Sequence, residues 1–441
     1  MKFYDRETEQ LELERLWDQT DSKSNLVVVT GRRRLGKTLL VTQFAKPFTH
    51  FYFFAKKKPE ALLCQEFLAI LRERLPFPVL GEITRFKDIL ILLFEYAKKE
   101  KIIVILDEFQ EFFTINPSVY SEMQNLWDKY KFTAKMLFIA IGSVYSLMYK
   151  IFENEKEPLF RRADRIMKLT PFSIPMIAKV LLDHQVIGDR NLFDFYVTTG
   201  GVPKYLDFLM TSRVKNLQGI LDFMLAEFSP FLEEGRHLLT LEFGKESGIY
   251  FSVLELLSAG RTSRSEIESI LGFGVGGYMD RLEKTYGIIY RVVPLNAKPT
   301  SLRIKFAIKD PFLQFWFRFI YRNWSAIELK NFGYVREIIE RDYSTYCGRL
   351  LERFFLELIA LTKKYNRIGP YWEQKNSNEI DIVAINDLER KLFIAEVKID
   401  PKKFNLYELQ HKAQNLLKLY DGYQVTWANL SLQDVVKFVS L

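Results

Sequence analysis

The sequence has few cysteines, and this scarcity argues against two kinds of stabilising chemistry. Only Cys64 and Cys347 occur among the 441 residues. Neither stands in the spacing of a disulfide framework or of a zinc cluster. The composition therefore fits a reducing compartment, and we expect a fold that is held together by its apolar core.

Long apolar runs are also missing. No uninterrupted apolar stretch is long enough to cross a bilayer, and residues 1–7 contain no apolar signal core. We therefore expect a cytoplasmic protein with no membrane partner. The chain also lacks internal repeats and low-complexity linkers.

A strong charge imbalance is absent as well. Lys and Arg number 63 and Asp and Glu 55, which leaves a formal net charge of +8. This modest excess favours an anionic partner such as nucleic acid without establishing one. With 48% hydrophobic and 27% charged residues, the composition is that of a globular protein. A chain of this length exceeds one ordinary core, so we expect two to four domains.

The first part of the chain alternates short apolar runs with longer amphipathic segments, which predicts a parallel α/β sheet. The predicted strands are residues 26–30, 50–55, 102–106, 136–141 and 165–169. We expect an α/β core that spans residues 1–172.

A glycine-rich loop follows the first predicted strand. Its residues are Gly31, Arg32, Arg33, Arg34, Leu35, Gly36, Lys37 and Thr38, with Leu39 next in the following helix. The two glycines let the backbone turn tightly and present N–H groups to a β-phosphate. Lys37 would contact the β- and γ-phosphates, and the Thr38 hydroxyl would bind Mg²⁺. The pattern predicts an ATP site with Mg²⁺.

The strand 102–106 ends in two carboxylates, Asp107 and Glu108. Asp107 is predicted to belong to the Mg²⁺ shell, and Glu108 is the candidate general base that orients the attacking water. Standing alone, such a pair would be interpreted as a solvated turn or a helix cap. The phosphate loop upstream favours ATP hydrolysis instead.

Three further polar features could belong to the ATP site. Ser143 follows the strand 136–141, where a side chain either senses the γ-phosphate or caps a turn. Arg161 and Arg162 are candidate arginine fingers, in cis or from a second copy of the chain, which would make a homo-oligomer. The triplet 32–34 could contact phosphates or an acidic surface, and solvation at the loop tip is the alternative.

After residue 172 the pattern becomes helical, and Gly200 and Gly201 mark a turn before a helix start. We expect a helical lid over residues 173–240. Helical patterns at 248–259, 263–271 and 277–285 precede strands at 288–294 and 302–308, which predicts a winged helix within residues 241–330. Such a module either binds DNA or mediates protein contacts. The aromatic segment 310–319 indicates packing between domains, with base stacking by Phe315 or Trp316 as the alternative.

The last part of the chain, residues 331–441, carries a second acidic constellation. Glu379 and Asp381 share one face of a predicted strand, and Glu396 and Lys398 share one face of the next. Phosphodiester cleavage needs carboxylates that hold Mg²⁺ and a lysine that activates water or stabilises charge. The sequence therefore predicts a possible metal-dependent nuclease site.

This part resembles the PD-(D/E)XK nuclease superfamily, in which Asp381 matches the metal-binding aspartate and Glu396-Val397-Lys398 matches the Glu-x-Lys element. The resemblance implies a further metal ligand, Glu352, from the helix 350–361, and an auxiliary polar residue, Gln410. Ile380 stands where a proline often precedes the aspartate.

Together, the phosphate loop, the Asp107-Glu108 strand, the Gly200-Gly201 turn and the acidic tail resemble one family. It is the archaeal-type P-loop ATPases of the AAA+/STAND-related branch with a C-terminal DUF234 domain. The resemblance implies an ATPase core, a lid, a winged helix and a restriction-endonuclease-like tail. We expect an ATPase that binds DNA and licenses metal-dependent cleavage. The alternative is a non-cleaving switch whose winged helix and tail bind DNA or a protein.

Overall fold

A computed structural model describes residues 2–243, 247–295, 297, 304–373 and 377–439 of the chain. The chain divides into two compact units, Tyr4–Pro171 and Phe172–Leu441 with Met1–Phe3. The boundaries predicted at residues 240 and 330 fall inside the second unit and stay predictions. Within the described ranges, no helix has both the length and the apolar character that crossing a membrane requires.

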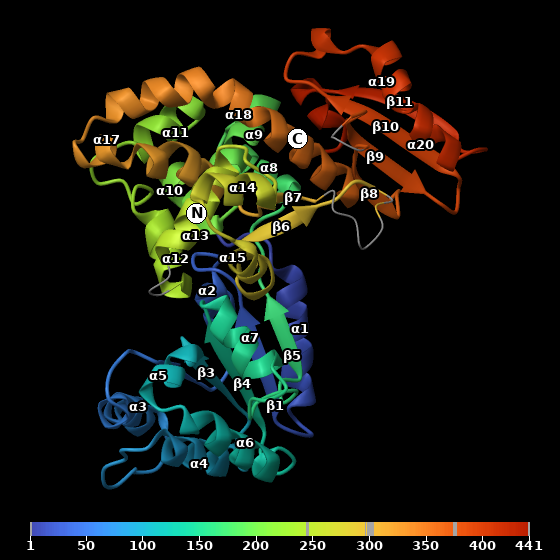
Figure 1. Cartoon of the computed structure of the whole chain (residues 1–441). Helices are drawn as coiled ribbons and strands as arrows, with labels where there is room; N and C mark the ends of the chain where they lie inside the picture. The colour runs from blue at the N-terminus through green and yellow to red at the C-terminus, as the bar shows by residue number, and fades with distance from the viewer. Residues whose placement is uncertain (1, 244–246, 296, 298–303, 374–376, 440–441) are drawn as a thin grey trace. The chain divides into compact units, whose positions relative to one another are not determined.

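The first unit is built on a five-stranded parallel sheet in the order β2-β3-β4-β1-β5 (Figure 1). The three central strands are buried along their whole length, because helices cover both faces of the sheet. This arrangement confirms the predicted α/β core, and each strand lies within one residue of its predicted bounds. The strands are β1 Asn25–Thr30, β2 His50–Phe54, β3 Ile102–Asp107, β4 Met136–Gly142 and β5 Arg165–Lys168.

Alternate residues of the strands face two different helical layers. Val28, Phe53 and Val104 belong to one apolar cluster with residues of α3, α4 and α6. Their neighbours in the strands point to the opposite face, where α1 and α2 contact the sheet. The helices are α1 Glu7–Gln19, α2 Lys37–Ala45, α3 Glu60–Arg74, α4 Phe86–Ala97, α5 Phe112–Ile115, α6 Ser118–Tyr130 and α7 Tyr145–Glu153, with the 3-10 turn η1 Phe109–Glu111.

The second unit begins with helices where the sequence predicts a helical lid. Phe172 donates its backbone N–H to Gly201 O at 2.8 Å, which ties the start of the unit to the turn between α9 and α10. Gly201 has φ 71°, and a Cβ there would collide with the Phe172 carbonyl, so this close approach requires glycine. The helices are α8 Ile174–Asp183, α9 Asp189–Thr199, α10 Pro203–Thr211, α11 Leu217–Met224 and α12 Glu234–Phe243.

Three helices and a two-stranded antiparallel wing follow, in the predicted order. The wing pairs Ile289 with Ile308 and Val292 with Lys305. Of the predicted strand 302–308, residues 302 and 303 lie outside the described residues. The elements are α13 Ser247–Ser258, α14 Arg264–Leu271, α15 Gly276–Asp280 with the π-helical turn η3 Arg281–Thr285, β6 Ile289–Val292 and β7 Lys305–Ile308.

The aromatic segment forms part of the core of the second unit. Phe315 and Trp316 are fully buried, and Trp316 Nε1 donates to Leu232 O at 2.8 Å. Base stacking by these two rings is therefore wrong, because no nucleic acid could reach them. The elements are α16 Pro311–Phe315, η4 Trp316–Ile320, η5 Tyr321–Asn323 and α17 Trp324–Glu328.

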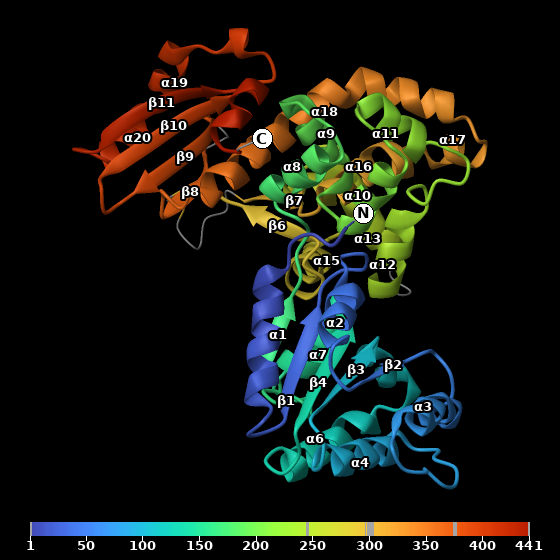
Figure 2. The same ribbon diagram turned by 180° about the vertical axis from the view of Figure 1, so that it is seen from behind.

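A helix of 30 residues, α18 Phe332–Leu361, continues from this core to a four-stranded mixed sheet, which it contacts through β8, β9 and β10 (Figures 1 and 2). The order of strands is β11-β10-β9-β8, with β10 antiparallel to β9 and parallel to β11. The elements are β8 Arg367–Tyr371, β9 Ile380–Asn386, β10 Lys391–Val397, η7 Pro401–Lys403, α19 Leu406–Lys412, α20 Gln414–Leu419, β11 Gln424–Leu430 and η8 Leu432–Lys437.

Candidate functional site

The loop between β1 and α2 turns at two glycines. Gly31 has φ 138°, and a Cβ there would lie 2.7 Å from Leu169 O, while Gly36 has φ 84° directly before α2. Both positions need glycine, one for space and both for backbone conformation. Because α2 begins at Lys37, its first-turn N–H groups lack helical partners and form a site that favours anions.

The Lys37 ammonium lies inside this loop. Its Nζ donates to Gly31 O at 2.7 Å and to Arg32 O at 2.9 Å. Burial lowers the pKa of Lys37 to about 8, although the carboxylates of Glu108 and Asp107 oppose the shift. In this loop the lysine donates to backbone carbonyl oxygens, which are weaker acceptors for an ammonium group than phosphate oxygens would be.

Thr38 and Asp107 lie together at the ends of α2 and β3. Thr38 Oγ1 donates to Asp107 Oδ2 at 2.6 Å, and the Tyr52 hydroxyl donates to the same oxygen at 2.9 Å. The other carboxylate oxygen accepts the backbone N–H of Glu108 at 2.9 Å. A hydroxyl and a carboxylate beside a phosphate loop are the oxygen donors that Mg²⁺ prefers, so the residues present fit that ion.

Glu108 has φ 55°, which turns the chain sharply after β3. Ser143 Oγ donates to both Glu108 oxygens, at 2.9 and 2.7 Å, and Gln110 Nε2 also donates to this carboxylate. The Arg33 guanidinium lies 3.7 Å from it. Ser143 thus contacts the candidate base, and Glu108 is held by three side chains from three segments.

The rest of the phosphate loop divides between buried and exposed positions. Leu35 is buried against the core, whereas Leu39 is exposed. Arg33 Nε donates to Ser143 Oγ at 3.4 Å, so one arginine of the triplet turns toward the acidic side chains of the core. Arg34 adopts a positive φ of 71° at the tip of the turn.

Arg162 lies away from the phosphate loop of its own core, which corrects the prediction of a finger in cis. Its guanidinium pairs with Asp128, at the end of α6, at 3.1 Å. Two residues later, Asp164 N donates to Leu26 O at the amino end of β1. The phosphate loop follows the carboxyl end of that strand, so the length of β1 separates the two features.

The tail carboxylates meet on the hairpin of β9 and β10. The register pairs Ile382 with Ala395, which brings Asp381 opposite Glu396. Asp381 Oδ2 accepts the Val397 N–H at 2.8 Å and lies 3.8 Å from Lys398 Nζ. Glu396 is buried and forms ion pairs with Lys398 and with Lys412, the latter at 3.0 Å.

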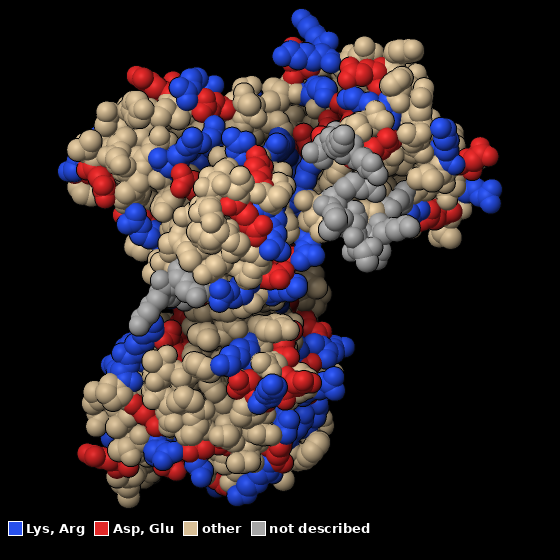
Figure 3. Space-filling view, viewed as in Figure 1, with Lys and Arg blue, Asp and Glu red and all other residues tan. Residues whose placement is uncertain are grey.

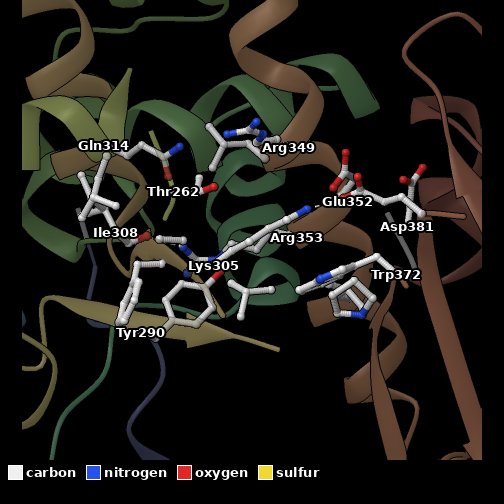
Figure 4. Close-up of a pocket in the computed structure, with 18 of the residues that line it drawn as sticks. Thr262, Tyr290, Lys305, Ile308, Gln314, Arg349, Glu352, Arg353, Trp372 and Asp381 are labelled. Atoms are coloured by element: carbon white, nitrogen blue, oxygen red, sulfur yellow. Dashed lines mark hydrogen bonds and ion pairs between the residues drawn. The ribbon is translucent and has the colours of Figure 1, made fainter. Parts of the chain in front are cut away.

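Glu352 reaches the same cavity from α18, beside Asp381 (Figure 4). Its carboxylate makes no hydrogen bond or ion pair with the described residues. Burial and the carboxylates of Asp381 and Glu379 raise the pKa of Glu352 to about 8. Burial and Glu396 raise the pKa of Asp381 to about 6. Burial and the neighbouring carboxylates therefore favour the neutral, protonated form of Glu352.

The tail carboxylates line one cavity, but their present spacing does not form a metal cage. Within the described parts of the chain, no three Asp, Glu, His or Cys side chains are arranged to hold a metal ion. Lys398 and Lys412 each donate a hydrogen bond to one oxygen of Glu396 instead. The oxygen donors and the unpaired Glu352 nevertheless have the chemistry that a divalent cation requires.

Three side chains that contact these sites, those of Lys412, Tyr52 and Gln110, were not predicted from the sequence. In α19 it is Lys412 that reaches Glu396, whereas Gln410 is exposed, so the prediction of Gln410 as the auxiliary residue is corrected. Lys412 could have been chosen by its charge, because a buried glutamate needs a cation. Tyr52 and Gln110 depend on which strands and turns become neighbours, and spacing along the chain does not show this.

Two family profiles match separate parts of the chain. Residues 3–209 match an ATPase domain found predominantly in Archaea. Residues 316–409 match DUF234, described as archaeal and bacterial proteins of unknown function.

The chain is also similar to one relative and to two solved structures. An uncharacterized protein of Methanocaldococcus jannaschii is 29% identical over 408 residues, which cover 90% of this chain and 87% of that protein. The solved Walker-type ATPase of Pyrococcus abyssi is 16% identical with a TM-score of 0.53, covering 71% of this chain and 96% of that one. The Aeropyrum pernix ORC2 protein, solved in ADPNP–ADP complexes, is 12% identical with a TM-score of 0.48, covering 77% and 96%.

The fold, the phosphate loop and the matched profiles agree on an ATP-binding and ATP-hydrolysing core. The chain thus combines an archaeal-type ATPase domain with a C-terminal DUF234 domain.

Proposed function

We propose that this ATPase uses its nucleotide state to license metal-dependent cleavage of a nucleic acid by its C-terminal domain. One observation carries the proposal: carboxylates from α18, β9 and β10 line a single cavity with a lysine that follows β10. These residues are Glu352, Asp381, Glu396 and Lys398. Carboxylates with a neighbouring lysine are the groups that phosphodiester hydrolysis needs.

At the ATP site, each contact serves either to bind the nucleotide or to hydrolyse it. Lys37 exchanges its carbonyl partners for the β- and γ-phosphates of ATP. Thr38 and Asp107 would hold Mg²⁺, which offsets charge on the phosphates. Glu108 is the base that orients the attacking water, and Ser143 fixes the direction of its carboxylate.

At the tail site, Glu352 and Asp381 would hold a divalent cation, with Glu396 as a third ligand once its lysines shift. The cation would supply an activated water and stabilise charge on the phosphate. Lys398, 3.8 Å from Asp381, is placed to stabilise the developing negative charge or to orient the water. Glu352 supports this assignment, because its oxygens make no hydrogen bond or ion pair with the described residues and a bound cation would favour its ionised form.

We assign nucleic acid, with DNA favoured, as the partner. The net charge of +8 supports an anionic ligand. On the face seen in Figure 3, basic and acidic side chains are interspersed. Arg291, in wing strand β6, pairs with Asp280 and Glu283 of the third helical segment of the winged helix. These ion pairs weaken the attraction of Arg291 for phosphates. We therefore assign phosphodiester binding to the tail cavity.

A cleavage assay with the full-length chain, ATP and Mg²⁺ or Mn²⁺ tests the proposal. Asp381→Asn and Lys398→Ala should abolish cleavage of DNA while ATP hydrolysis continues. Glu389→Gln is the matched control, because Glu389 is an acidic residue of the same hairpin that pairs with Lys391 at its turn. If wild-type protein leaves all DNA and RNA substrates intact, the nuclease assignment is wrong.

A non-cleaving switch is the second candidate, and one observation favours it. Both oxygens of Glu396 are already paired, with Lys398 and Lys412. Permanent pairing would leave a tail that binds a phosphate backbone without cutting it. Metal-independent DNA binding that survives Asp381→Asn, with no cleavage by the wild type, would support this function instead.

A further inference from the structure

The carboxylates occupy only one end of a larger cavity in the second unit. The cavity has a volume of about 420 Å³ and extends from the hairpin of β9 and β10 to the wing strands β6 and β7. Figure 4 shows Glu352 and Asp381 at one end and Gln314, Thr262 and Tyr290 toward the other. This volume lies in the range of small-molecule pockets, roughly 300–1,000 Å³. A cavity of this size has room for one nucleotide.

The wing forms a wall of this cavity. Leu295 N donates to Pro370 O at 2.8 Å, and Lys305 pairs with Glu379 at 2.8 Å. Lys305 Nζ also lies 4.4 Å from the centre of the buried Trp372 ring. These contacts link the wing to the C-terminal sheet, so both elements line the same cavity.

Arg349 lines the middle of the cavity and has most of its hydrogen-bonding capacity available. Among the described residues its guanidinium makes a single long hydrogen bond, 3.4 Å to Gly260 O, and no ion pair. The neighbouring Arg353 is instead occupied by Glu357 and by Ile308 O. Arg349 is therefore the cation with the capacity to bind a phosphate.

The end away from the carboxylates combines neutral polar groups with the Arg353 guanidinium, which lies 5.6 Å from the centre of the Tyr290 ring. Gln314 and Thr262 line it, and no hydrogen bond of either side chain is found within the described residues. Tyr290 adds an aromatic ring and a hydroxyl. An amide, a hydroxyl and a ring are the groups that recognise the edge and face of an unpaired base.

We propose that this cavity takes the terminal nucleotide of a single nucleic-acid strand. Its base lies near Gln314 and Tyr290, Arg349 binds its phosphate, and the scissile phosphodiester lies at the Glu352 and Asp381 end. The inference rests on the proposed function and adds a substrate class to it. The water oxygen bonds to phosphorus, the ester P–O bond breaks, and the leaving oxygen takes a proton. The products are a phosphate monoester and a hydroxyl.

The experiment compares three labelled DNA substrates of one sequence with the full-length chain, ATP and Mn²⁺. These are a linear single strand, the same strand closed into a circle, and a blunt duplex. We expect the linear strand to be shortened stepwise from an end, with the circle and the duplex intact. Cleavage of the circle as fast as the linear strand would overturn the inference while leaving the proposed function standing. No cleavage of any substrate would instead remove the proposed function.

Binding tests the cavity separately from cleavage. With Asp381→Asn to prevent turnover, Arg349→Ala should weaken binding of the linear strand about tenfold or more, because a charge-assisted hydrogen bond is lost. Gln314→Ala should weaken it less. Arg341→Ala is the matched control, since Arg341 is exposed on α18 and pairs with Asp342 outside the cavity. Equal affinity in the Arg349 variant and its control would overturn the assignment of Arg349.

Discussion

Thr38 and Asp107 are 69 residues apart in the chain, yet the Thr38 hydroxyl donates to Asp107 Oδ2 at 2.6 Å. The contact joins the start of α2 to the end of β3, where the carboxyl ends of parallel strands meet. Both side chains present oxygen atoms beside the phosphate loop. The ATP site therefore depends on the register between β1, β4 and β3 as well as on the loop itself.

Thr38→Ala should raise the Mg²⁺ concentration needed for half-maximal ATP hydrolysis, because one of two oxygen donors is removed. The matched control is Thr42→Ala, one helical turn later, whose hydroxyl donates only to backbone carbonyls of α2. A Mg²⁺ titration of the hydrolysis rate checks the prediction. An unchanged midpoint in Thr38→Ala would contradict the assignment of its hydroxyl to the metal.

Glu108→Gln should keep ATP binding and slow hydrolysis by about 10²- to 10⁴-fold, the usual contribution of a general base. Ser143→Ala should slow hydrolysis less, because Gln110 still holds the carboxylate. Nucleotide affinity and single-turnover rates separate the two effects. A Glu108→Gln protein that hydrolyses ATP at the wild-type rate would require another base.

Much of the core and the outline of both sites could be predicted from the sequence. The strands of the first unit are short apolar runs because both faces are buried, and such runs are easy to recognise. Strand alternation puts Asp381 and Glu396 each on a defined face, whereas the hairpin register brings them opposite each other. The face of each residue depends on local pattern alone, and the register does not.

Features that depend on which elements become neighbours could not be predicted. Tyr52 reaches Asp107 because β2 pairs with β3, and strand order is not written in local spacing. Arg162 was a candidate arginine finger because it follows an apolar turn. That turn leads into the amino end of β5, away from the carboxyl ends of the strands where the phosphate loop lies. The wing closes the tail cavity through Lys305 and Glu379, which lie 74 residues apart.

Gly235→Ala should lower the stability of the second unit by about 1–3 kcal/mol, the usual cost of overpacking a core. Gly235 lies in α12, and a Cβ there would overlap the ring of the buried Trp316. Alanine normally favours a helix, so the packing clash has to outweigh a gain of about 1 kcal/mol.

Gly277→Ala is the control for this prediction. Gly277 is exposed in α15, and its Cβ would meet no atom within 4 Å. This variant should be at least as stable as the wild type. Thermal unfolding followed by circular dichroism compares the two, and a more stable Gly235→Ala protein would mean that Trp316 can move aside.

The measurement that tests the account most directly is the rate of single-strand cleavage by the full-length chain with and without ATP. Lys37→Ala should lose tight ATP binding, because its ammonium is the cation inside the phosphate loop. Lys46→Ala, at the exposed end of α2, is the control. We predict that ATP accelerates cleavage by the wild type and by Lys46→Ala but not by Lys37→Ala. Cleavage by the wild type that is equally fast with and without ATP would contradict control of the tail by the nucleotide.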